Sequence, residues 1–146
     1  MMSVLEALQD REPYLDGYGY GTYPAAYAAY AEKFAPLFSQ AVQESDDISE
    51  LAERLLDELA EDVKKQSIFA RGRVRGDQKM ILAVYLSPML LASPESKCRE
   101  LAQTLCDQWK KRYPKDAYCL AKYERIAGGF HRKILGFRIE ESTDKE

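Results

Sequence analysis

The chain has 146 residues, of which 46% are hydrophobic and 31% charged, with a formal net charge of −3. This length predicts one domain with a substantial core, since a domain of about 150 residues buries roughly 68–70% of its unfolded surface. No apolar run approaches the about 20 residues that a membrane span needs, and the N-terminus lacks the features of a signal peptide. We therefore expect a cytoplasmic protein with no membrane partner.

Charge is distributed in blocks along the chain. Residues 1–63 carry a net charge of −11, residues 64–138 a net charge of +11, and residues 139–146 a net charge of −3. The acidic and basic blocks either press together, within one chain or across a dimer, or leave a basic face for an anionic partner. Both arrangements remain open from the sequence.

The N-terminal third is predicted to hold a short helix, an irregular stretch and a longer helix. Residues 3–8 favour the short helix, and the proline and glycines of residues 13–22 interrupt regular structure. Pro24 suits the first turn of the longer helix, whose apolar residues recur every three or four positions. Pro36 lies inside that pattern and predicts a kink or a division of the helix.

The middle of the chain is predicted to hold an acidic helix, a basic loop and an apolar helix. Asp47 is the expected N-cap of the acidic helix, which runs to about Phe69. The loop, 71–76, is bracketed by glycines, and Asp77 is the expected cap of the helix that follows. That helix, about 78–92, is apolar on almost every side, which predicts a central position.

Two alternatives concern the apolar segment. A buried strand at 80–86 fits the same residues, because a short apolar run has no distinguishing period. Pro88 is expected to bend or end the segment in either case.

The last part of the chain is predicted to add two or three more elements. Ser93-Pro94 begins a helix with an apolar stripe, and Pro114 ends it after three basic residues. A further helix spans about 116–127, whereas 130–139 is a short helix or a strand. We predict an all-α fold, a single compact domain (1–139) of five or six helices around the central apolar helix (about 78–92), with an acidic, disordered tail at 140–146.

The basic segment is the first candidate site. Its cations alternate along a chain that leads into a helix N-terminus, and guanidinium groups bind phosphate oxygens in bidentate fashion. This pattern favours binding of nucleic acid or a phosphorylated ligand. The alternative is that the arginines pair with the acidic helix or stay solvated. The predicted anion-binding residues are Arg71, Arg73, Arg75, Lys79, Arg132 and Lys133.

Tyrosines form the second candidate site. Six of the ten lie between residues 14 and 30, and several alternate with glycine in a stretch that could cover a pocket. Tyr27 and Tyr30 are expected in the core. The alternative to a flap over a pocket is that the glycine-rich stretch packs on its own helix. The predicted flap or pocket residues are Tyr14, Tyr18, Tyr20 and Tyr23.

No pattern points to catalysis, a metal or a cofactor. His131 is the only histidine, and the three cysteines lack zinc-ligand spacing. The leading hypothesis is therefore a non-catalytic module that binds a protein partner or a second copy of itself. The first alternative is binding of nucleic acid or a phosphate ligand through 71–79. The second alternative is a small-molecule binder or enzyme with a tyrosine-lined pocket.

Overall fold

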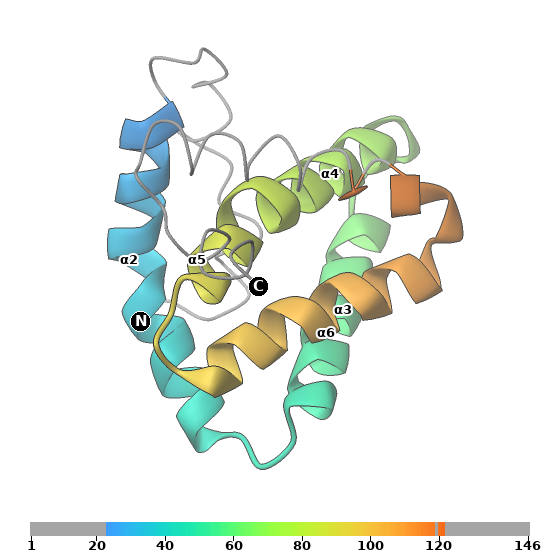
Figure 1. Cartoon of the computed structure of the whole chain (residues 1–146). Coiled ribbons are helices and arrows are strands. Elements are labelled where there is room, and N and C mark those ends of the chain that lie inside the picture. Colours follow the sequence, from blue (N-terminus) through green and yellow to red (C-terminus); the bar gives the residue numbers. More distant parts are fainter. Residues whose placement is uncertain (1–22, 119, 122–146) are drawn as a thin grey trace.

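The computed structural model describes residues 23–118, 120 and 121, with only the backbone of 23–26. Every regular element among these residues is helical, so the all-α prediction is confirmed (Figure 1). The predicted helix 3–8, the segment 130–139 and the tail 140–146 lie outside the described residues. The elements are α2 (Tyr23–Glu44), α3 (Ile48–Lys65), α4 (Ile68–Ile81), the π-helical turn η2 (Leu82–Leu86), α5 (Ser87–Leu91), α6 (Ser96–Arg112) and the 3-10 turn η3 (Pro114–Asp116).

Helix α2 is one helix that contains Pro36, so the expected division at this proline does not occur. The buried residues of α2 recur every four positions, which holds one face against the core over three turns. Those residues are Tyr30, Phe34, Phe38 and Val42. Pro36 itself is exposed and lies outside the buried face of the helix.

Helix α3 begins where the sequence predicts. The Asp47 carboxylate accepts hydrogen bonds from the backbone N–H groups of Ser49, at 3.0 Å, and Glu50, at 3.3 Å. These bonds satisfy two N–H groups that have no partner inside the helix. The helix ends at Lys65, before the predicted Phe69, because Gln66 and Ser67 are extended and a new helix starts at Ile68.

The predicted basic loop is wrong. Residues 71–76 lie inside α4, which runs through Gly72 and Gly76, and Asp77 is an interior residue of the helix. The helical conformation is maintained because Val74, Gln78 and Ile81 face the core at helical spacing. Neither glycine has a left-handed backbone, and a Cβ added at either would meet nothing within 4 Å.

The apolar segment is helical and central, so the alternative strand at 80–86 is wrong. Helices α4 and α5 are joined by η2, where the backbone N–H of Ser87 bonds to the carbonyl of Leu82, five residues earlier. This wider turn immediately precedes Pro88, which has no N–H to continue the α-helical pattern. The continuous helical segment of α4, η2 and α5 does not end at Pro88 and stays in the core, and η2 packs against both α2 and α6.

Helix α6 packs against α3, which it crosses in the view of Figure 1. It starts at Ser96, slightly later than predicted, and its buried stripe includes the expected Cys98, Leu101 and Leu105. Trp109 near its end is 1% exposed and contacts the ring of Tyr113 at 5.2 Å between centroids. The predicted stop at Pro114 is confirmed, because α6 ends at Arg112 and η3 follows.

Candidate interaction surface

Two of the predicted anion-binding residues hold a carboxylate of the chain itself. Lys79 Nζ lies 3.2 Å from Asp116 Oδ1, and Arg75 Nη2 lies 3.7 Å from Asp116 Oδ2. Trp109 Nε1 donates a hydrogen bond of 3.0 Å to the same carboxylate. The Arg75 guanidinium also stacks on the ring of Tyr113, 4.3 Å from its centroid. We call these five residues the Asp116 cluster.

The electrostatics of the cluster favour the ionised carboxylate. Burial by itself would raise the pKa of Asp116, but the hydrogen bonds from Trp109 and Lys79 and the charges of Lys79 and Arg75 lower it by more. The side chains of Asp116 and Lys79 are 13% and 16% exposed, so water screens this pair only in part. The cluster therefore fastens the turn after α6 to α4.

The other predicted anion-binding residues have different surroundings. Arg71 donates hydrogen bonds from Nε to the carbonyl of Gln66, at 3.1 Å, and from Nη2 to the carbonyl of Lys64, at 3.0 Å. It therefore satisfies carbonyl groups at the C-terminal end of α3, where a cation also complements the helix dipole. Arg73 is exposed and has no ion-pair partner among the described residues. Arg132 and Lys133 lie outside them.

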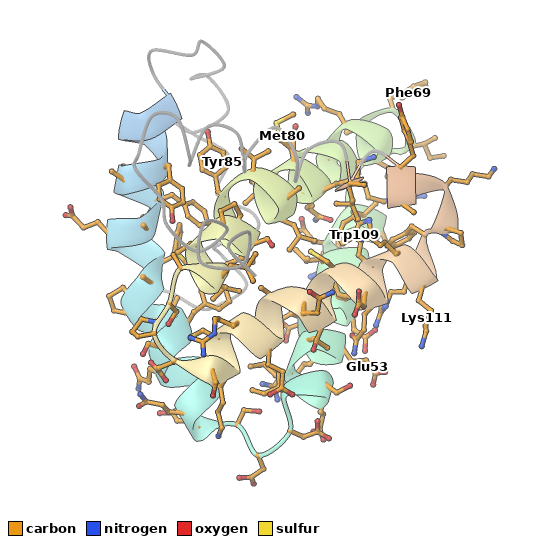
Figure 2. The ribbon with its side chains drawn as sticks, in the orientation of Figure 1. Glu53, Phe69, Met80, Tyr85, Trp109 and Lys111 are labelled. Atoms are coloured by element: carbon orange, nitrogen blue, oxygen red, sulfur yellow. The ribbon has the colours of Figure 1, made fainter. Side chains whose placement is uncertain are left out.

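Two large apolar side chains are exposed in the first turn of α4. Phe69 is 99% exposed and Ile68 is 78% exposed, whereas the apolar stripes of the helices are buried. Figure 2 shows Phe69 at the outer end of α4, away from the packed side chains around Trp109. Lys64 and Lys65 precede the pair in the chain, Arg71 and Arg73 follow it, and no acidic residue lies between 63 and 76. We call residues 64–73 the α3–α4 corner.

An acidic groove lies at the other end of α3. It has a volume of about 520 Å³ and follows the turn between α2 and α3. Its floor is formed by Ala41, Leu51 and Leu55. Its charged lining consists of five carboxylates and one guanidinium, from Glu44, Asp46, Asp47, Glu50, Glu58 and Arg54.

A second groove, of about 430 Å³, lies between α2 and the start of α6. Tyr27 lines it, and burial raises the pKa of this phenol to about 12. Cys98 also lines it, and burial raises the pKa of the thiol, so this cysteine lacks the thiolate character of a nucleophile. The Glu95 carboxylate at its edge accepts hydrogen bonds from Ser39 and, at 3.2 Å, from Gln43 Nε2.

The tyrosine predictions are tested only in part. Tyr27 and Tyr30 belong to the core region as expected, Tyr30 being fully buried and 5.5 Å from the ring of Tyr85. Tyr23 is the first residue of α2, whereas Tyr14, Tyr18, Tyr20 and His131 lie outside the described residues. The described range contains no group of three or more His, Cys, Asp or Glu side chains placed to hold a metal. No described helix is long and apolar enough to cross a membrane.

Comparisons with known proteins add no relative: no family model matches the chain, and no match was found among curated proteins or among solved structures. Function is therefore inferred from the residues of the chain.

Two features of these surfaces escape the sequence reasoning. Asp116 lies 37 residues after Lys79, and nothing in the sequence pairs them. The sequence gives no signal for the exposure of Phe69 either. At 100° per residue, a continued α3 would place Phe69 five whole turns after the buried Leu51, and thus on the apolar stripe. Only the break at Gln66 and Ser67 moves Phe69 off that stripe.

Proposed function

We propose that this chain is a non-catalytic protein-interaction module whose contact surface is the α3–α4 corner. The observation that carries the proposal is the 99% exposure of Phe69 beside an exposed Ile68. Interfaces typically combine an apolar anchor with a charged, solvated rim, and aromatic side chains are enriched among their strongest contacts. Phe69 and Ile68 supply the anchor, and the cations around them supply the rim.

The charges favour a protein partner over nucleic acid or a phosphate ligand. Arg75 and Lys79 already bind Asp116, and Arg71 already bonds to backbone carbonyls. Nucleic-acid affinity depends on the number of phosphates that cations neutralise. Three of the four cations predicted for 71–79 are engaged in this way, and the exposed feature they leave behind is apolar.

A photo-crosslinking experiment tests the proposal. The full chain carries p-benzoylphenylalanine in place of Phe69, and a matched variant carries it in place of Gln103, an exposed residue of α6. We expect discrete protein adducts from position 69, several-fold above those from position 103, and their loss when Ile68→Ser is added. Equal yields from both positions would contradict the proposal.

A second arm separates the alternative. The unmodified chain is titrated into labelled RNA and DNA at low and physiological salt. Salt-sensitive binding that Arg73→Glu abolishes, together with no specific adduct at position 69, would replace protein binding with nucleic-acid binding.

A further inference from the structure

We infer that the partner of the α3–α4 corner is a second copy of this chain, which receives the corner in its acidic groove. This inference rests on the proposed function and deepens it by naming the partner. The two surfaces are complementary in charge, because the corner contains four cations and no acid, whereas the groove is lined by five carboxylates and one guanidinium. Of the four cations, Arg71 already bonds to backbone carbonyls and Lys64 lies 3.7 Å from Glu61, so Lys65 and Arg73 are the ones most available to a partner. Such complementarity steers encounter and fixes orientation.

The shapes also correspond. The corner projects two adjacent apolar side chains, Ile68 and Phe69, from the first turn of α4. The groove is a depression of about 520 Å³ whose floor is apolar and whose rim is acidic. Insertion of Phe69 would remove its ring from water, and the cations around it would face carboxylates.

The two surfaces do not meet within one copy. The groove extends along α3 to Glu58, which precedes Lys65 by 7 residues, or about 10 Å along the axis at 1.5 Å per residue; Leu51 in its floor is about 21 Å from Lys65. Phe69 is 99% exposed and lines no part of the groove of its own copy. The apolar floor of the groove is therefore open to the corner of another molecule.

This geometry predicts head-to-tail association. Each copy offers one corner and one groove, and these are different surfaces, so the contact is heterologous. Repetition of such a contact gives a closed ring or an open chain, in contrast to a two-fold dimer that pairs one patch with itself. The contact is small, so we expect dissociation constants between about 1 µM and about 1 mM.

Sedimentation velocity of the full chain over that concentration range, together with two double variants, tests the inference. The corner variant carries Phe69→Ser and Arg73→Glu, and the groove variant carries Glu44→Lys and Glu58→Lys. All four residues are exposed, so folding should be preserved, which circular dichroism checks. The matched control, Glu100→Lys with Asp107→Lys, makes the same charge change as the groove variant on exposed positions of α6.

We expect the native chain and the control to associate. Their association affinity should fall at least tenfold as salt is raised from low to about 1 M, where the screening length is about 3 Å. Each variant alone should be monomeric. Their equimolar mixture should form a 1:1 heterodimer and nothing larger, because one intact corner and one intact groove remain. A native chain that stays monomeric at about 1 mM, or a groove variant that associates like the native chain, would overturn the inference. Specific adducts of other proteins at position 69 would then still support the proposed function.

Discussion

Removal of the Asp116 carboxylate should destabilise the domain far more than its surface position suggests. Asp116→Ala leaves Lys79, only 16% exposed, without its counter-charge, and leaves the buried Trp109 without a hydrogen-bond acceptor. An unsatisfied buried donor costs about 1–3 kcal/mol. An uncompensated, partly buried charge adds a similar amount, while Arg75 adds little because it is 43% exposed and screened by water. Together these terms predict a loss of about 2–6 kcal/mol of unfolding free energy.

The measurement is urea denaturation followed by fluorescence of Trp109, the only tryptophan in the chain. Asp116→Asn is the informative partner variant, because its amide oxygen still accepts from Trp109 Nε1 while the negative charge is gone. We expect it to lose about half as much stability as Asp116→Ala. Adding Lys79→Met to Asp116→Ala should recover part of the loss, since the unpaired cation is removed and its apolar stem is kept.

The pH dependence follows from the direction of the pKa shift. The pKa of Asp116 is lower in the folded chain than in the unfolded chain, where it is about 3.9. Its stabilising contribution is therefore fully present above about pH 4 and is lost as pH falls through the folded pKa. The difference between the native chain and Asp116→Asn should shrink over that acidic range. Equal stability of the two chains at pH 7 would refute the assigned role of the cluster.

Other predictions test single features of the fold. Gly72→Ala and Gly76→Ala should each stabilise the chain by about 0.5–1 kcal/mol, because both positions are helical with room for a Cβ. A thermal unfolding midpoint that does not rise in either variant would contradict the helical assignment and support the loop. Asp47→Ala should cost about 1 kcal/mol in urea through loss of two cap hydrogen bonds, and Asp47→Asn should retain most of it. Phe69→Ser should change stability by less than about 0.5 kcal/mol, whereas Phe34→Ala should cost about 3–5 kcal/mol.

Helix ends and apolar stripes could be predicted wherever local chemistry decides them. The Asp47 cap and the Pro114 stop act within one turn, so residues next to each other in the chain suffice. The loop prediction for 71–76 was wrong because local helix propensity and tertiary burial act in opposite directions there. Two interior glycines cost about 2 kcal/mol of helix propensity. Burial of Val74 and Ile81 returns about 3–6 kcal/mol, and only the folded neighbours show that these residues are buried.

The acidic and basic blocks neither pair completely nor leave the whole basic block free for a partner. Arg112 reaches across to Asp57 at 2.6 Å, so α6 and α3 do form an ion pair between the blocks. Glu50, Glu53 and Glu58 nevertheless remain exposed, without a cation partner among the described residues. The carboxylate that does engage the basic segment is Asp116, an acid that lies within the basic block itself.

This outcome explains why the acidic groove and the cationic corner both persist on one molecule. Pairing inside the basic block uses Arg75 and Lys79 at the inner face of α4 and leaves the outer turn, with Phe69 and Arg73, facing water. Among the groove carboxylates, Asp47 caps α3 and Glu44 accepts a hydrogen bond from Gln40, but none forms an ion pair with a cation of the described residues. Two unlike, complementary surfaces that do not meet within one copy are what head-to-tail association requires. The fold itself therefore creates the condition on which the proposed self-association depends.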